Sequence, residues 1–324
     1  MASAPEQLLP GISVVIPVYN SEKSLEPLLD RLGKVLPTLA GRYEVILVND
    51  GSRDDSWGVI RRLIAERPWL RAFNLMRNYG QHNALLCGIR AARYDTTVTM
   101  DDDLQHPPEE IAKLLAEIER GFDVVYGTPL QQQHGLWRDL ASRMTKLAMQ
   151  SAIGFDNARK VSAFRAFRTK TRQAFSEHSG PYVNVDVVLT WASNKFSSVA
   201  VPHDLRLVGK SNYTFGKLVV HAINMTTGFS TLPLRVTAIM GFGLTLFGVG
   251  VLLYVLIRYV IQGSTVPGFP FLASLLSIFS GAQLFALGVI GEYLARMHFR
   301  MMDRPTYTVR EISDLPSEHM PAER

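Results

Sequence analysis

The sequence predicts an α/β fold, with a mostly parallel, doubly wound sheet, followed by a hairpin of two membrane-spanning helices. Up to about residue 230, short runs of Val, Ile and Leu alternate with segments that have helical spacing. This alternation is typical of strand–helix–strand units whose sheet is covered on both faces. After residue 230, two apolar stretches are each long enough to cross a bilayer. The chain has 324 residues, which is enough for both parts.

The alternation begins with ISVVIPVY (12–19), a continuous apolar run that is typical of a buried strand. Segment 21–36 follows with helical spacing and with serines at its start that can cap a helix. Further strands are expected at 43–50, 70–78, 96–103 and 122–129, and further helices at 54–67, 80–93 and 107–121. The last helix begins with two prolines and two glutamates, which are favoured in a first turn.

The two membrane spans are expected at 232–261 and 269–294, where charges occur only near the ends. A soluble core helix is the alternative, but such helices rarely run this long without a polar face. The connector 262–268 is short, so the spans would form an antiparallel hairpin, and glycines on both would allow close helix contact. Basic residues flank the outer ends of the hairpin, which places both termini and the N-terminal domain in the cytoplasm.

The chain is therefore divided into an N-terminal domain (1–212), an amphipathic helix in the membrane interface (213–230), the hairpin (231–296) and a C-terminal tail (297–324). A linker helix packed on the soluble domain is the alternative for 213–230. The end of the tail, after about residue 312, is expected to be disordered. The N-terminus lacks a basic region followed by an apolar stretch, so no signal peptide is expected.

Composition narrows the classes of function. The net charge of +5 suits an anionic partner, either nucleic acid or an acidic membrane face. Basic residues are not interleaved with aromatic residues in patches, and no nucleic-acid-binding motif occurs, so nucleic acid is not an expected partner. Cys87 is the single cysteine, which excludes an intrachain disulfide and a cysteine-based zinc site. We expect it to be a small apolar core residue.

Three consecutive aspartates, Asp101 to Asp103, end the strand predicted at 96–103. Their mutual repulsion is tolerable if they face a crevice, and ligands of parallel sheets bind outside the carboxyl ends of the strands. Asn49 and Asp50 fall at another such end. Two carboxylates in a D-x-D pattern can bind Mg²⁺ or Mn²⁺, which also grips phosphate oxygens. The pattern alone also occurs on solvated turns, but together with I-P-V-Y-N and V-N-D-G-S it indicates a nucleotide diphosphate.

These motifs, with RNYGQHNALLCG, SAFRAFR and GKSNYTFGKL, resemble family 2 glycosyltransferases that act on polyprenyl phosphates. This group includes dolichol-phosphate mannose synthase, the bacterial undecaprenyl-phosphate glucosyltransferases and the undecaprenyl-phosphate 4-deoxy-4-formamido-L-arabinose transferase; RNYGQH is most similar to the last branch. The resemblance covers essentially the whole chain. It implies a GT-A fold, a tetramer, and transfer of a sugar from a nucleotide sugar, preferably a UDP-sugar, to undecaprenyl or another polyprenyl phosphate. The expected setting is the cytoplasmic face of a bacterial inner membrane, and the expected product serves cell-envelope glycan or lipid A modification.

The resemblance also implies three groups of site residues. The nucleotide group is Pro17, Tyr19, Asn20, Asp50 and Asp102. The catalytic group is Asp101, Asp103, Gln105 and Arg165, with Asp103 as the principal metal ligand and Asp101 as the second. The group expected to approach the acceptor phosphate is Arg206, Lys210 and Ser211. Binding of anionic lipid is the alternative for the two basic residues of this last group.

The chain departs from the family pattern at three places. Ser21 stands where a glutamate usually follows Y-N, and Asn49 replaces the first aspartate of D-D-G-S. Arg159 and Lys160 stand where an aspartate often precedes the SAFRAFR-like strand. A processive polysaccharide synthase is one alternative, opposed by two spans only and by the lack of Q-x-x-R-W. An inactive nucleotide-sugar-binding scaffold is another, supported by Ser21 and Asn49 and opposed by the intact acidic motif.

Overall fold

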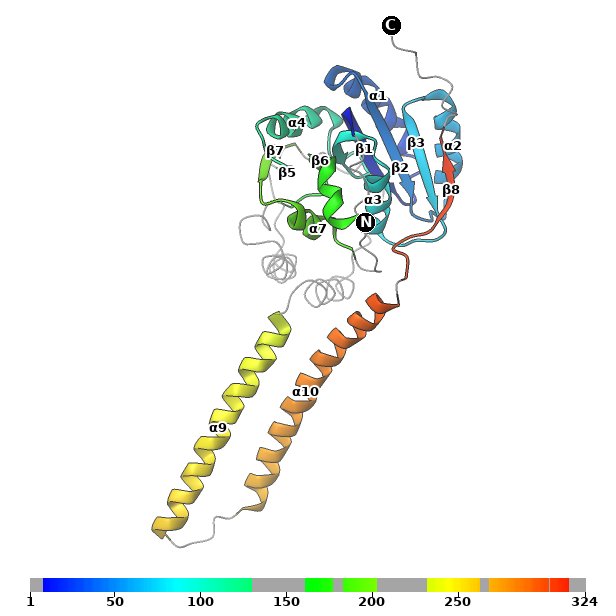
Figure 1. Cartoon of the computed structure of the whole chain (residues 1–324). Coiled ribbons are helices and arrows are strands. Elements are labelled where there is room, and N and C mark those ends of the chain that lie inside the picture. Colours follow the sequence, from blue (N-terminus) through cyan, green and yellow to red (C-terminus); the bar gives the residue numbers. More distant parts are fainter. Residues whose placement is uncertain are drawn as a thin grey trace, which may run out of the picture. The chain divides into compact units, whose positions relative to one another are not determined.

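The structure is a computed structural model and describes residues 8–129, 161–176, 183–202, 232–262, 268–302 and 304–314. The chain divides into two compact units. In the described residues, the first unit holds an eight-stranded sheet with its covering helices, and the second holds two long helices (Figure 1).

The sheet is mixed and has the order β7-β5-β6-β4-β1-β2-β3-β8. Its strands are β1 (Leu9–Val18), β2 (Tyr43–Asn49), β3 (Leu70–Leu75), β4 (Tyr94–Thr99), β5 (Val124–Pro129), β6 (Arg165–Arg168), β7 (Phe196–Val201) and β8 (Val309–Ser313). β1 pairs in parallel with β2 and β4, and β2 pairs in parallel with β3. β6 runs antiparallel between β4 and β5, and β8 runs antiparallel beside β3. The predicted α/β fold is confirmed, and its four parallel central strands end at one edge.

Helices cover both faces of the sheet, as a continuous apolar strand sequence requires. Val14, Ile16 and Val18 of β1 belong to a buried cluster with α1 (Leu25–Leu39), α2 (Ser56–Glu66) and α4 (Ile111–Glu119). Val15 points to the other face and joins a cluster with α3 (Gln81–Ala91), the 3-10 helix η2 (Thr169–Phe175) and α7 (Val185–Ala192). Because neighbouring side chains of a strand alternate between faces, both faces of β1 must be apolar. Cys87 of α3 is buried, as expected.

The second unit contains α9 (Leu232–Gln262) and α10 (Phe269–Met301). Both begin at the residues predicted for the membrane spans. The stretches Pro233–Ile261 and Ile278–His298 are long and apolar enough to cross a membrane, and neither is buried in the structure. Their exposed Leu, Ile, Val and Phe side chains would contact lipid favourably and water unfavourably, unlike those of a soluble core helix.

The C-terminal region has more structure than the sequence analysis assigned to it. α10 continues to Met301, into the segment treated as a tail, and Val309–Ser313 forms the edge strand β8. We did not predict this strand, because VREIS is short and partly charged. The interfacial helix expected at 213–230 and the last ten residues lie outside the described part of the chain.

Candidate active site

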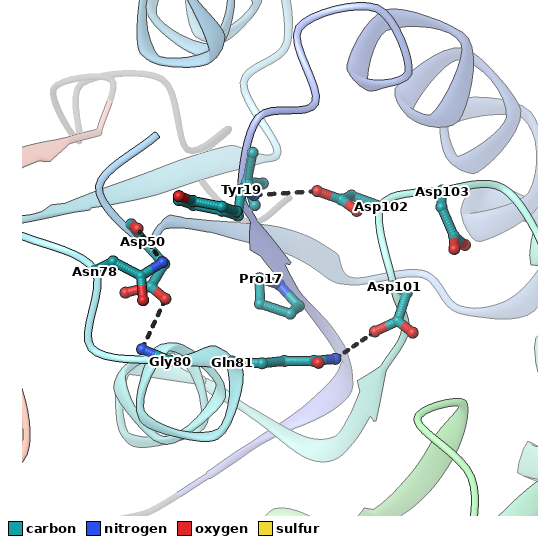
Figure 2. A pocket seen from close by; sticks show the side chains of 10 residues that line it. Pro17, Tyr19, Asp50, Asn78, Gly80, Gln81, Asp101, Asp102 and Asp103 are labelled. Carbon is teal, nitrogen blue, oxygen red and sulfur yellow. Dashed lines mark hydrogen bonds between the residues drawn. The ribbon is translucent and has the colours of Figure 1, made fainter. Parts of the chain in front are cut away.

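The carboxyl ends of β1, β2 and β4 open into a cavity of about 290 Å³. The described residues that line it are Pro17, Val18, Tyr19, Asp50, Asn78, Gly80, Gln81, Asp101, Asp102 and Asp103 (Figure 2). Most residues predicted for nucleotide and metal binding therefore come together here from segments that are far apart in sequence. They do so because parallel strands present their carboxyl ends at one edge.

The three aspartates after β4 diverge, which reduces the cost of placing like charges side by side. Figure 2 shows Asp102 turned toward Tyr19, whereas Asp101 turns toward Gln81. Asp102 Oδ2 accepts hydrogen bonds from the Tyr19 N–H at 3.3 Å and from the Ser21 hydroxyl at 2.5 Å. Burial raises the pKa of Asp102 to about 6; the two hydrogen bonds oppose this rise, and the charge of Asp103 adds to it. Asp102 thus connects the loop that contains the three aspartates, called the acidic loop below, to the loop after β1.

Asp101 and Asp103 accept hydrogen bonds from different groups of the protein. Gln81 Nε2 donates to Asp101 Oδ1 at 2.6 Å, and the Gln105 N–H donates to Asp103 Oδ1 at 3.1 Å. Between Asp103 and Gln105, the buried Leu104 has a φ of 60°. This left-handed conformation is rare for a bulky residue and is typical of functional loops that the surrounding structure holds in place.

Asp101 and Asp103 have the chemistry required of metal ligands. Mg²⁺ and similar ions prefer oxygen ligands and are often bound by one or two carboxylates together with substrate phosphates. Within the described residues, no group of three His, Cys, Asp or Glu side chains is arranged to hold a metal by itself. Two carboxylates of this kind fit a cation whose remaining ligands are phosphate oxygens and water, as in a metal–diphosphate complex.

Asp50, which directly follows β2, organises the β3–α3 loop (residues 76–80). Its two carboxylate oxygens accept the N–H groups of Tyr79, at 2.7 Å, and of Gly80, at 2.9 Å. Asn78 Nδ2 donates to the Asp50 backbone carbonyl at 3.1 Å. Burial raises the pKa of Asp50, while the two N–H groups and the positive charge of Arg77 act in the opposite direction. Asp50 therefore shapes the cavity by fixing the loop that lines it.

Gly51 brings the β2–α2 loop against the β3–α3 loop. Its φ is +63°, and a Cβ atom at this position would lie 2.6 Å from both the Arg77 carbonyl carbon and the Asn78 nitrogen. Both the backbone conformation and the close approach exclude a side chain. The V-N-D-G-S motif thus supplies Asp50 as an acceptor and Gly51 as the contact that lets the two loops meet.

Arg165 lies at the start of β6, is 1% exposed, and is not among the described residues that line the cavity. Its Nε donates to Thr99 Oγ1 at 2.9 Å, and its guanidinium pairs with Asp186 of α7. Asp186 also accepts the Tyr126 hydroxyl at 3.1 Å. Burial lowers the pKa of Arg165, but the charges of its neighbours, chiefly Asp186 and also Asp101, raise it overall. Arg165 is therefore held in a buried ion pair beside the end of β4, the strand that leads into the acidic loop.

The remaining predicted residues have the following positions. Asn20 has a φ of 56°, and its Oδ1 accepts the Arg53 N–H at 2.8 Å, so this side chain holds the β2–α2 loop. Gln105 contacts Asp103 through its backbone N–H. Asn49 is buried, and its Nδ2 donates to Asn74 Oδ1 at 2.9 Å. The predicted acceptor residues Arg206, Lys210 and Ser211, and the departures at 159 and 160, lie outside the described residues.

The sequence analysis missed several residues of the site. Asn78, Gly80 and Gln81 line the cavity, and Asp186 pairs with Arg165. The first three belong to RNYGQH, which was used for the resemblance but given no role. Their position between a predicted strand and a predicted helix was the available signal. Asp186 stands in the apolar run VNVDVVL, where a charged residue predicts a buried partner.

The sheet order and the cavity with its acidic loop are those of an α/β protein whose ligand site lies at the carboxyl ends of the strands. The sequence comparison gives its family. Residues 13–177 match the family described as Glycosyl transferase family 2, and the chain belongs to this family. The predicted GT-A fold is consistent with this assignment.

Individual relatives align along nearly the whole chain. The undecaprenyl-phosphate 4-deoxy-4-formamido-L-arabinose transferase of Shewanella sediminis (strain HAW-EB3) is 34% identical over 304 residues, covering 93% of this chain and 92% of that protein. The protein with the same name from Pseudomonas syringae pv. syringae (strain B728a) is 34% identical over 305 residues, covering 93% and 90%. A solved structure of glucosyl-3-phosphoglycerate synthase from Mycobacterium tuberculosis, in complex with Mn²⁺, UDP and glucosyl-3-phosphoglycerate, aligns with a TM-score of 0.49 and 19% identity over 67% of this chain and 78% of that one.

Proposed function

We propose that this chain is a membrane glycosyltransferase that transfers a sugar from a nucleotide sugar to undecaprenyl phosphate. The product would be a lipid-phosphate-linked sugar used for cell-envelope glycan or lipid A modification. The observation that carries the proposal is that Pro17, Tyr19 and Asp50 line the same cavity as Asp101 and Asp103. Relatives that match 93% of the chain bear the name of an undecaprenyl-phosphate sugar transferase, which supports the lipid acceptor.

The donor would bind with its nucleoside against Pro17, Tyr19 and Asp50 and its diphosphate toward Asp101 and Asp103. The resemblance of RNYGQH to the formamido-arabinose branch favours a UDP-sugar as donor. Mg²⁺ or Mn²⁺ bound by Asp103 and Asp101 would supply positive charge to the departing diphosphate. The separate hydrogen bonds of Asp101 and Asp103 would leave these two carboxylates directed toward the ligand, while those of Asp102 support the loop.

The reaction needs no dedicated base, because a polyprenyl phosphate is already an anion near neutral pH. One of its oxygens attacks the anomeric carbon, and the bond from this carbon to the nucleotide diphosphate breaks. In-line attack inverts the configuration of the anomeric carbon. The protein then contributes mainly position and charge. Arg206, Lys210 and Ser211 would hold the acceptor phosphate, and Gln105 would lie near the diphosphate. Arg165, which is buried and paired with Asp186, would support the site through β6 and β4.

The membrane setting follows from α9 and α10, which would anchor the enzyme in the bacterial inner membrane as its two spans. The distribution of basic residues supports a cytoplasmic position for the N-terminal domain (1–212) and the C-terminal tail, and the segment 213–230 would lie in the interface before the first span. We further propose a homotetramer, which the small residues of both spans would permit.

The proposal is tested with the full chain in liposomes that contain undecaprenyl phosphate. UDP-4-deoxy-4-formamido-L-arabinose, UDP-glucose and GDP-mannose, each labelled in the sugar, are offered with Mg²⁺, with Mn²⁺ or with a chelator. We expect label in a single lipid that extracts into organic solvent, and no transfer with the chelator. A ladder of polymers would instead support a processive synthase. Nucleotide binding without transfer from any donor would support an inactive scaffold.

A further inference from the structure

The strand that follows the second membrane helix in sequence returns to the sheet of the first unit. β8 pairs antiparallel with β3, with Ala72 opposite Ser313 and Leu75 opposite Val309. The register shifts between Asn74 and Leu75, directly before the β3–α3 loop. Such irregularities re-aim the chain and are common next to active sites. The position of this strand therefore affects the path of the loop that lines the cavity.

Both backbone polar groups of Met76, the first residue of the loop, bind to the C-terminal segment. The Met76 N–H donates to the Thr308 carbonyl at 2.9 Å. Arg310 Nη2 donates to the Met76 carbonyl at 3.0 Å. The loop itself is partly exposed, with Met76 at 47%, and loops with few buried contacts open easily unless they are tied down. The C-terminal segment therefore holds the loop where it leaves the sheet.

The same segment also contacts the helix at the other end of the loop. Tyr307 and Val309 pack against the buried cluster that contains Leu85 and Cys87 of α3. The guanidinium of Arg90 lies 5.7 Å from the centre of the Tyr307 ring. Because α3 begins at Gln81, the segment thus fixes both the start of the loop and the helix into which it leads.

The distal part of β8 makes a different set of contacts. Glu311 Oε2 accepts the Trp57 Nε1–H at 3.1 Å, and Asp314 Oδ1 accepts from Arg71 Nε at 3.2 Å. These bonds hold the strand to α2 and to the beginning of β3, away from the loop. They provide matched controls, because they support the same strand without contacting the loop residues.

We propose that residues 306–310 are a positioning element of the nucleotide-sugar site. They fix Met76 and α3, and so hold Asn78, Gly80 and Gln81 in the orientation that lines the cavity. The identity of the ligand rests on the proposed function; the effect on the loop does not. The alternative is that the segment only covers the sheet edge, which would protect the protein from edge pairing without affecting the site.

The test compares two double variants of the full chain in lipid nanodiscs. Tyr307→Ala with Arg310→Ala removes contacts to α3 and the loop, and Glu311→Gln with Asp314→Asn weakens the distal contacts. Hydrogen exchange of the Tyr79 and Gly80 amides is measured together with the melting temperature and with the Kd for UDP. We expect faster exchange of both amides, and a Kd raised roughly five- to tenfold, in the first variant only. Unchanged exchange in the first variant, or equal effects of both variants, would overturn the proposal.

A reversible cross-link distinguishes the loss of loop positioning from a simple folding defect. Leu75→Cys with Val309→Cys, in a Cys87→Ser background, places two cysteines at directly opposed positions of the antiparallel pair, a spacing that suits a disulfide. In the Tyr307→Ala, Arg310→Ala variant, oxidation should restore slow exchange and tight UDP binding, and reduction should abolish both. Failure of oxidation to restore the slow exchange would also overturn the proposal. Slow exchange that depends on the segment, in a protein that binds neither UDP nor GDP, would refute the proposed function alone.

Discussion

Gly51→Ala should disturb the nucleotide site by moving the β3–α3 loop. The new Cβ would lie 2.6 Å from the Asn78 nitrogen, where an ordinary contact is at least 3.4 Å, so the loop backbone must retreat by about 0.8 Å. The left-handed φ of +63° costs roughly 1 kcal/mol for a residue with a side chain. Weakening the bonds from the loop amides to the Asp50 carboxylate adds about 1–3 kcal/mol. We expect a loss of about 2–4 kcal/mol in the free energy of unfolding.

The assay combines thermal unfolding of the detergent-solubilised chain with titration by UDP. UDP affinity should fall roughly tenfold or more, because the loop that lines the cavity is displaced. Gly41→Ala is the matched control: a Cβ atom there meets nothing within 4 Å, so stability and affinity should stay near those of the parent protein. A Gly51→Ala protein that binds UDP within twofold of the parent would refute the view that this loop contact shapes the site.

Three further substitutions test separate parts of the site. Asp103→Asn should abolish sugar transfer to lipid while the protein stays in the membrane fraction, and Glu109→Gln, which loses only a surface ion pair, should not. Asp186→Asn should lower stability by about 3–5 kcal/mol in thermal unfolding, because it leaves the charge of Arg165 buried without its partner. The raised pKa of Asp102, about 6 against an ordinary 3.8, means that the folded state holds this proton more tightly than the unfolded state. Its contribution to stability should therefore fall as pH rises from about 4 to about 6 in metal-free buffer, and the same pH series on Asp102→Asn should lack this fall.

The central part of the fold and the position of the site were predictable because both depend on local patterns. Continuous apolar runs indicated strands that are buried on both faces, and acids at their carboxyl ends indicated the cavity. The two long helices followed from length and hydropathy. The edge strand β8 had no such signal: VREIS is short, and it pairs with β3 across more than two hundred residues of sequence. The ion pair between Arg165 and Asp186 could not be predicted from the sequence either, because only the packing of α7 brings Asp186 to Arg165.

Two of the three departures from the family pattern, Ser21 and Asn49, have structural roles, and this weakens the alternative of an inactive scaffold. Ser21 stands in place of the usual glutamate. Its hydroxyl donates the shorter of the two hydrogen bonds described above for Asp102, and so stabilises the acidic loop. Asn49, in place of the usual aspartate, is buried and bonded to Asn74, and its Oδ1 accepts from the Ser52 hydroxyl at 2.6 Å.

Ser21 and Asn49 are not among the described residues that line the cavity. A protein that had lost its activity would be under no constraint to keep Asp101 and Asp103 in the cavity with separate hydrogen-bond donors. Ser21 and Asn49 are neutral where the family usually has acidic residues, so the negative charge near the site is lower. This makes it easier to bring an anionic diphosphate to the carboxylates. The two departures are therefore best understood as changes in the support of the site, with the proposed ligands of the cation and the nucleotide retained.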